Sequence, residues 1–189
     1  MQFGIKDEEF IRGKVPMTKA EIRAMVMVKA AIQPGDIVAD IGAGTGSLSI
    51  EAARCCPKGA VYSIERNPEG IELIRKNAEK FGCRNIHTIA GTAPEAMEGL
   101  PKMDVIIIGG SSGNMHEILD RCEALLAPGG RIILTAVTVE TTGEVVKEFA
   151  DRPFEVEGFE MQINRLRNLG RYHLYDPMSP IFIFTAIKH

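Results

Sequence analysis

The residues best suited to chemistry form a glycine-rich loop, Asp40–Ser47, of sequence DIGAGTGS. Glycines let the backbone turn sharply and let a ligand approach without meeting a Cβ atom. The spacing is Gly-x-Gly-x-Gly, whereas the dinucleotide fingerprint, which places a pyrophosphate at a helix N-terminus, is Gly-x-Gly-x-x-Gly. Asp40, directly ahead of the glycines, is an anion poorly placed to receive phosphates. The loop therefore favours a ligand with positive charge, and the amino and sulfonium groups of S-adenosyl-L-methionine supply it.

A second acidic residue, Glu65, follows Gly46 by nineteen residues. This is close to the spacing of about 20 residues at which an acidic side chain meets ribose hydroxyls. A carboxylate at this position can accept hydrogen bonds from both hydroxyls. Two further loops are weaker candidates: 91–95 could close over an adenine, and 109–113 lies where a substrate and a methyl group would meet.

The elements that would position these residues alternate along the chain. Apolar residues at helical spacing predict a helix over 19–31, with Thr18 as its N-cap and Glu21 completing a capping box. Short apolar runs then predict strands at 37–41, 60–65, 85–90, 104–108 and 131–137. Helices are expected between and after them, at 48–56, 68–81, 94–99 (a brief one), 114–126 and 141–151. The tail differs: its pattern predicts two strands, at 154–161 and 181–187, with no helix between them, and hence antiparallel neighbours.

Repeated strand–helix units predict an α/β fold of the Rossmann-like kind, with helices on both faces of a mostly parallel sheet. Seven strands are expected, the last of them antiparallel, within one domain that spans residues 1–189. Ligands of such sheets bind outside the carboxyl ends of the strands, at the point where the strand order reverses. Both Asp40–Ser47 and Glu65 lie at such ends.

Composition narrows the class of protein. The net charge of −3 lowers the odds of a dedicated nucleic-acid binder, which usually carries a basic excess. The apolar runs are too short to span a bilayer, so a soluble, cytoplasmic protein is expected. The four cysteines form no Cys-x-x-Cys pair, which argues against a metal site and for buried thiols in a reducing compartment.

These motifs together resemble the class I S-adenosylmethionine-dependent methyltransferases. More narrowly, the chain resembles the decarboxylating methyltransferases of cobalamin biosynthesis, which act on cobalt-precorrin-6B. The resemblance covers nearly the whole chain. Besides Asp40–Ser47, its carriers are FIRGKVPMTK at 10–19, IEAA at 50–53, APE at 93–95 and IIGGS at 107–111, with the Pro-Gly-Gly turn at 128–130. Residues 112–115 depart from the more glycine-rich run expected there.

The resemblance implies methylation of carbon 15 of the corrin precursor, with loss of carbon dioxide from the acetate on carbon 12. It also implies a homotetramer and S-adenosyl-L-methionine as the cofactor. Together with the interpretation of the loop, it gives these cofactor-binding residues: Thr18, Asp40, Gly42, Ala43, Gly44, Thr45, Gly46, Glu65 and Ala93. No catalytic side chain is assigned, because the macrocycle itself can act as nucleophile and electron sink.

A corrin precursor carries several carboxylates, so cationic groups should line its cleft. Basic residues cluster near the N-terminus (Arg12, Lys14, Lys19, Arg23) and in the tail (Arg165, Arg167, Arg171, His173). The predicted substrate-binding residues are Arg12, Lys14, Gly110, Ser111, Arg165 and Arg171. His87 and His116 are interpreted as structural.

Other functions remain open at this level. A transfer RNA adenine methyltransferase would share the glycine loop, but the acidic balance and the absence of an Asn-Pro-Pro-Tyr-type sequence after the fourth strand count against it. A protein carboxyl methyltransferase is a further option. A non-catalytic S-adenosylmethionine-binding module is another, since a fold alone does not guarantee function. The glycine spacing disfavours an NAD-dependent dehydrogenase.

Overall fold

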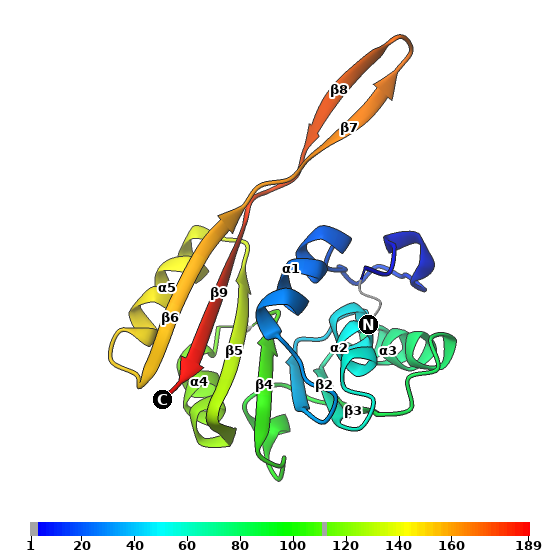
Figure 1. Cartoon of the computed structure of the whole chain (residues 1–189). Coiled ribbons are helices and arrows are strands. Elements are labelled where there is room, and N and C mark those ends of the chain that lie inside the picture. The colour runs from blue at the N-terminus through cyan, green and yellow to red at the C-terminus, as the bar shows by residue number, and fades with distance from the viewer. Residues whose placement is uncertain (1–3, 111–112) are drawn as a thin grey trace.

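The computed structural model describes residues 4–110 and 113–189. Its centre is a seven-stranded sheet in the order β3-β2-β1-β4-β5-β9-β6 (Figure 1). Six strands are parallel, and β9 runs antiparallel to both of its neighbours, β5 and β6. The predicted sheet, including its one antiparallel strand, is thereby confirmed. The strands are β1 (Ile37–Ile41), β2 (Ala60–Glu65), β3 (Ile86–Ala90), β4 (Met103–Ile108), β5 (Leu126–Ala136), β6 (Phe154–Met161) and β9 (Ile181–Lys188).

Helices cover both faces of this sheet because side chains alternate along each strand. Val38 of β1 packs toward α1 and α2, whereas its neighbours Ala39 and Ile41 belong to the core beneath α4 and α5. The first face carries α1 (Ala20–Ala30), α2 (Ser47–Cys55) and α3 (Pro68–Lys80), and the second carries α4 (Met115–Leu125) and α5 (Val139–Phe149). Two short 3-10 turns, η1 (Asp7–Glu9) and η2 (Glu95–Met97), complete the layers.

The N-terminal caps of α1 and α5 differ from the sequence prediction. The predicted N-cap role of Thr18 is wrong: α1 begins at Ala20, and Lys19 is its N-cap without a side-chain cap bond. The carbonyl oxygen of Thr18 instead accepts a hydrogen bond from the buried guanidinium of Arg23, at 2.6 Å. Helix α5 begins earlier than predicted, because the hydroxyl of Thr138 accepts the backbone N–H of Thr141 and caps it.

The N-terminal segment 4–19, called the strap below, lies across α2 and α3. Its backbone N–H groups donate to three side chains of those helices: Ile5 to Glu51 at 2.9 Å, Ile11 to Asn77 at 2.8 Å and Lys14 to Glu69 at 2.7 Å. Arg23 of α1 is fully buried and pairs with Asp7 at 2.8 Å. Its charge is therefore used to hold the strap, which corrects the expectation that it belongs to a substrate-binding cluster.

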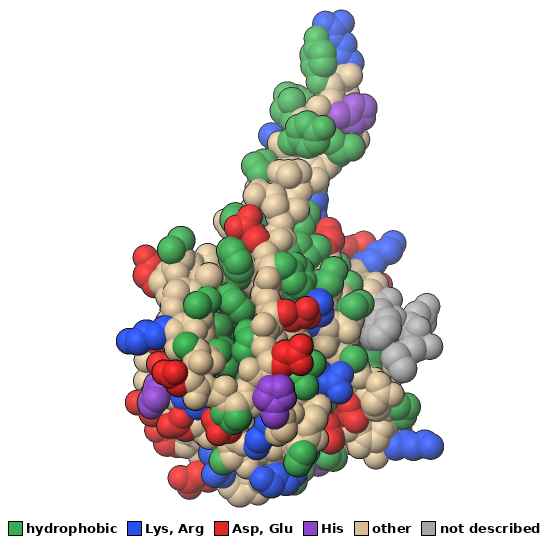
Figure 2. Space-filling view, turned by 60° about the vertical axis from the view of Figure 1, so that its left-hand side comes forward, with side chains coloured by type: hydrophobic (Ala, Val, Ile, Leu, Met, Phe, Trp, Pro, Cys, Tyr) green, Lys and Arg blue, Asp and Glu red, His purple; other side chains and the backbone are tan. Residues whose placement is uncertain are grey.

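A feature that the sequence analysis missed stands between β6 and β9. Strands β7 (Asn164–Leu169) and β8 (Tyr172–Pro177) pair as an antiparallel hairpin, called the arm below. The arm projects from the edge of the sheet at which the parallel strands end (Figure 1). Every residue of both strands is exposed. Figure 2 shows hydrophobic side chains along its length, and the exposed ones are Leu166, Leu169, Tyr172, Leu174 and Tyr175.

Within the described ranges, none of the helices combines the length and apolar character that a membrane crossing requires. The four cysteines are free thiols; Cys55, Cys56 and Cys122 are buried and Cys83 is half-buried. Burial raises the pKa of Cys122 to about 12, so this thiol stays protonated near neutral pH. Among residues 4–110 and 113–189, no three His, Cys, Asp or Glu side chains are grouped as metal ligands.

Candidate cofactor and substrate site

The glycine loop lies at the carboxyl end of β1, between the ends of β2 and β4, which is the switch point of this sheet. Gly42, Gly44 and Gly46 all have positive φ, at 73°, 58° and 77°, a conformation that residues with a Cβ rarely adopt. A Cβ atom at Gly42 would also lie 3.2 Å from the backbone nitrogen of Gly110. The turn therefore favours glycine at all three positions, and at Gly42 the close approach of the neighbouring loop requires it as well.

Glu65, at the end of β2, is 8% exposed and closes onto this loop. One carboxylate oxygen accepts the N–H of Gly44 and the other accepts the N–H of Asn67, both at 2.7 Å. A Cβ atom at Gly70 of α3 would lie 2.8 Å from Cγ of Glu65, so only glycine fits beside it. Each carboxylate oxygen can still accept another hydrogen bond, as two ribose hydroxyls would require.

Two cavities flank Glu65. The smaller has a volume of about 140 Å³ and is lined by Ile41, Gly42, Ile64, Glu65, Arg66, Gly91, Thr92, Ala93, Gly110 and Ile118. The larger, of about 410 Å³, is lined by 15–19 of the strap, by 42–45 of the glycine loop, and by Ile22, Leu48, Glu65, Gly109, Thr135, Val137 and Ile181. Both walls include Gly42 and Glu65. The arrangement suits a ligand with an apolar ring at one end, a diol at Glu65 and a polar tail along the strap.

The structure brings most of the predicted cofactor residues to these walls. Thr18, Ala43, Gly44 and Thr45 line the larger cavity, and Ala93 lines the smaller one. Gly46 lines neither; it is the N-cap of α2 and packs against Ile74 of α3. Sequence reasoning missed the wall formed by the ends of β5 and β9, at Thr135, Val137 and Ile181. For Thr135 and Val137 the available signal was their position at the carboxyl end of β5, whereas Ile181 is the first residue of the antiparallel β9.

Asp40 is also absent from both cavity walls, because its position in β1 directs its side chain toward α2. The carboxyl group is fully buried and accepts a hydrogen bond from Ser49 of α2 at 2.5 Å. Ser63 of β2, the register partner of Asp40, donates in turn to the Ser49 hydroxyl at 2.7 Å. Burial raises the pKa of Asp40 to about 6, although the Ser49 bond opposes this. Asp40 thus supports the loop from behind, and its other oxygen has no hydrogen-bond partner among the described residues.

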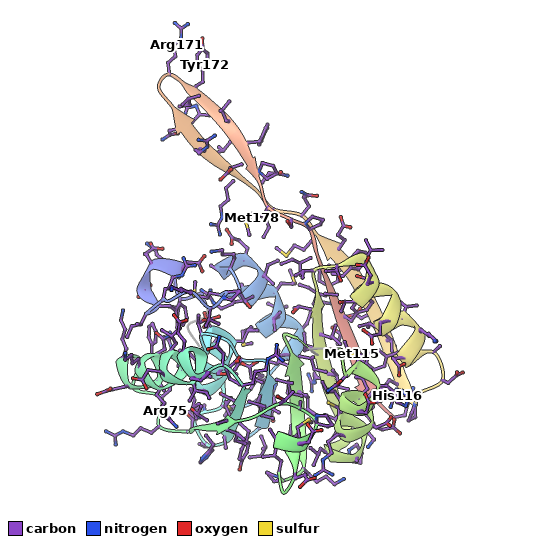
Figure 3. All side chains as sticks on the ribbon, turned by 180° about the vertical axis from the view of Figure 1, so that it is seen from behind. Arg75, Met115, His116, Arg171, Tyr172 and Met178 are labelled. Carbon is purple, nitrogen blue, oxygen red and sulfur yellow. The ribbon has the colours of Figure 1, made fainter. Side chains whose placement is uncertain are left out.

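The predicted substrate-binding residues are scattered. Arg12 and Lys14 are exposed on the strap and line neither cavity. Arg165 at the start of the arm pairs with Glu21 of α1 at 2.6 Å, so its charge is already compensated. Arg171 lies at the far end of the arm beside Tyr172, away from the cavities of its own chain (Figure 3). Gly110 lines the smaller cavity, and Ser111 lies outside the described residues.

An apolar ledge adjoins the larger cavity at the base of the arm. A third cavity, of about 330 Å³, is lined by Ala136, Val137, Thr138, Val139, Thr142, Glu160, Pro180 and Phe182. It shares Val137 with the larger cavity. Val137 and Val139 are 67% and 85% exposed, so apolar side chains face solvent beside this cavity. Val137 of the ledge and Lys19 of the strap, a cationic residue, therefore both line the larger cavity.

Comparison with known proteins gives a consistent picture. The family described as "Precorrin methyltransferase domain" matches residues 9–188. The cobalt-precorrin-6B C(15)-methyltransferase (decarboxylating) of Salmonella typhimurium is 36% identical over 186 residues, which is 97% of this chain and 96% of that protein.

Solved structures agree with the sequence match. A precorrin-6y C5,15-methyltransferase from Geobacter metallireducens superimposes with a TM-score of 0.93 at 37% identity, covering 98% of each chain. A precorrin 8w decarboxylase from Methanobacterium thermoautotrophicum gives a TM-score of 0.91 at 36% identity, covering 96% of this chain and 98% of that one. With the glycine loop, Glu65 and the cavities that they share, these matches place the chain in the precorrin methyltransferase family.

Proposed function

We propose that this protein methylates carbon 15 of cobalt-precorrin-6B, using S-adenosyl-L-methionine, with decarboxylation of the acetate on carbon 12. The observation that carries the proposal is the pair of cavities joined at Gly42 and Glu65 at the switch point of the sheet. The named relatives supply the identity of the substrate. The non-catalytic alternative is disfavoured because the loop, Glu65 and the substrate-side opening are all intact.

The residues present fit this cofactor. Ile41, Ile64 and Ala93 provide apolar walls for an adenine in the smaller cavity. The free acceptor sites of Glu65 suit the ribose hydroxyls, and the turn of the glycine loop leaves room that a Cβ atom would fill. The methionine part would then extend along Thr18 and Thr45. When bound, the cofactor supplies an electrophilic methyl group at a sulfonium.

The substrate side is assigned to the ledge and its rim. A corrin precursor is a flat ring system with carboxylates around its edge, so it needs an apolar surface bordered by cations. Val137, Val139 and Phe182 provide the surface, and Lys19 provides a cation at the opening. By holding the ring against the ledge, these residues would fix its reacting carbon in a near-attack position, an effect worth up to about 7–11 kcal/mol in well-oriented cases. Arg12, Lys14 and Gly110 remain predicted substrate contacts, although none of them lines the ledge or the larger cavity.

The arm supports a homo-oligomer, and by resemblance a homotetramer. A two-stranded hairpin is at best marginally stable in water, and this one exposes five large apolar side chains and two unpaired strand edges. Packing against other copies of the chain would cover them. Arg171 could then act on a neighbouring subunit, since the arm carries it away from its own cavities. We expect the assembly to act in the cytoplasm, without nucleic acid.

The decisive experiment is a mass spectrum of cobalt-precorrin-6B after incubation with the protein and S-adenosyl-L-methionine. We expect a gain of one methyl group and a loss of carbon dioxide. An unchanged substrate, in a preparation shown to bind S-adenosyl-L-methionine, would overturn the corrin assignment and leave the cofactor assignment in place. Transfer RNA assayed in parallel tests the alternative enzyme, and methylation of it alone would replace the proposal.

A further inference from the structure

One face of α3 forms the support on which the glycine loop lies. Gly70, Ile74 and Asn77 are spaced at i, i+4 and i+7 and therefore share a face of the helix. A Cβ atom at Gly70 would lie 2.9 Å from the carbonyl oxygen of Gly44, and one at Gly46 would lie 3.0 Å from Cγ1 of Ile74. The loop is thus in close contact with α3 along two turns of the helix.

Asn77, the third member of that face, contacts two segments at once. Its side chain is fully buried and makes three hydrogen bonds to backbone groups. The amide nitrogen donates to the carbonyl oxygen of Thr45 in the glycine loop at 3.0 Å, and to that of Ile11 in the strap at 3.1 Å. The amide oxygen accepts the N–H of Ile11 at 2.8 Å. One side chain therefore joins a cofactor loop to a segment 34 residues earlier in the sequence.

The strap and the glycine loop also touch directly at the larger cavity. A Cβ atom at Gly44 would lie 3.2 Å from the carbonyl oxygen of Pro16, and strap residues 15–19 form one wall of that cavity while 42–45 form another. The position of each wall is thus set relative to the other through Ile11, Asn77 and Thr45. Cavity walls that are already ordered lose little conformational freedom when a ligand binds. The ligand therefore binds with higher affinity.

We propose that Asn77 is a positioning residue for the cofactor: by tying strap to loop, it sets the affinity for S-adenosyl-L-methionine without touching it. The proposal rests on the cofactor assigned above but not on the identity of the methyl acceptor. It also explains why a polar side chain stands fully buried in a helix whose other buried residues are glycine, leucine and isoleucine.

The test compares Asn77→Asp with a matched control, Asn85→Asp. Asn77→Asp removes the N–H groups that donate to the carbonyl oxygens of Thr45 and Ile11. It also places a carboxylate oxygen opposite those two carbonyl oxygens. Asn85 also donates from its amide nitrogen to two backbone carbonyl oxygens, those of Ala53 and Cys56, at 3.1 and 2.9 Å. Its two acceptors are at the C-terminal end of α2, whereas Thr45 precedes the N-terminal end of that helix. Asn85 lines neither cofactor cavity. The two variants therefore lose the same kind of bonds in different places.

Calorimetric titration with S-adenosyl-L-methionine gives both the Kd and the number of sites. We expect Asn77→Asp to raise the Kd about tenfold or more with an unchanged number of sites, and Asn85→Asp to leave the Kd within about twofold. Loss of fold would instead reduce the number of sites. Hydrogen exchange without ligand should show that residues 11–18 and 42–46 lose protection together in Asn77→Asp only.

Asn77→Ser, a smaller neutral change, is the second variant should the aspartate prevent folding. It is also expected to raise the Kd for S-adenosyl-L-methionine. An unchanged Kd in a folded Asn77 variant, or exchange that rises in the strap but not in the loop, would overturn the proposal. Failure of the wild-type protein to bind S-adenosyl-L-methionine would instead refute the cofactor assignment. Titration of the wild-type protein, done first, distinguishes this outcome from a failure of the proposal for Asn77.

Discussion

The carboxylate of Glu65 accepts the backbone N–H of Gly44 at 2.7 Å, so the acidic residue at the end of β2 holds the middle glycine of the loop that follows β1. Its second oxygen holds Asn67, the N-cap of α3. A single side chain thus fixes the loop and the start of a helix, and both oxygens remain available at the junction of two cavities. The proposed cofactor site is organised around this contact.

Glu65→Gln is expected to weaken S-adenosyl-L-methionine binding by about 30-fold or more. Glutamine removes the charged acceptor and directs an N–H₂ group at a backbone N–H or a ribose hydroxyl, and hydrogen bonds to a charged group contribute about 1.5–3 kcal/mol each. Calorimetry measures the change in Kd. Glu72→Gln is the control, because Glu72 of α3 is exposed and pairs only with Lys76 among the described residues. Equal affinity in Glu65→Gln and wild type would contradict the role given to Glu65.

Gly70→Ala and Gly143→Ala should have opposite effects on stability. Both glycines are in helices, where alanine is favoured by about 1 kcal/mol. At Gly70 the new Cβ would meet Cγ of Glu65 at 2.8 Å, so we expect a net loss of about 1–3 kcal/mol and weaker cofactor binding. At Gly143 nothing lies within 4 Å, so we expect a gain of about 0.5–1 kcal/mol. Denaturant titration measures both, and a stabilised Gly70→Ala would show that α3 does not press on the loop as described.

Asp40→Asn should change how stability depends on pH. Because burial raises the pKa of Asp40 to about 6, the folded protein binds this proton more tightly than the unfolded chain does. The stabilisation from Asp40 is therefore complete below about pH 4 and is lost as the pH rises through about 6. Asparagine has no such proton. The free energy of unfolding of the variant, relative to wild type, should increase by roughly 2–3 kcal/mol from about pH 4 to about pH 7.5. A difference that stays constant across this range would show that Asp40 does not titrate there.

Val137→Asp tests the ledge. A carboxylate at this position would disfavour an apolar ring with a carboxylate rim, so KM for cobalt-precorrin-6B should rise about tenfold or more. The Kd for S-adenosyl-L-methionine should stay within a few-fold, because Val137 lies where the larger cavity adjoins the ledge, which is the side proposed for the substrate. Val146→Asp is matched to it: Val146 is 60% exposed on α5 and lines neither cavity. Equal KM values in the two variants would place the substrate elsewhere.

Removal of the arm should separate assembly from cofactor binding. Met161 and Ile181 are register partners of β6 and β9, so a two-residue Asn-Gly turn can join them in place of 162–180. The two ion pairs lost with Arg165, to Glu21 and to Asp7, lie at the solvent-accessible surface and contribute little stability. Light scattering should give an oligomer for wild type and a smaller species for the variant, with cofactor affinity within about twofold. An unchanged mass would assign the contacts between copies to another surface.

Local patterns in the sequence were sufficient to predict much of the fold and to identify several of the residues that line the two cavities beside Glu65. Strand–helix alternation predicts the sheet and its helices, since side-chain periodicity follows directly from backbone geometry. Gly42, Gly44 and Glu65 were recognisable because a positive φ demands glycine and because their spacing matches the length of one β-α-β unit.

Tertiary structure decided what depends on contacts between distant segments. Arg23, which as a basic residue suggested anion binding, is buried under the strap, and Asp40 faces α2 instead of the cavity. The arm was not predicted because its strands mix charged and apolar residues and pack against no core. Their sequences therefore lack a regular alternation of apolar and polar residues. The ledge at Val137 and the role of Asn77 likewise depend on partners tens of residues away, which only the folded chain brings together.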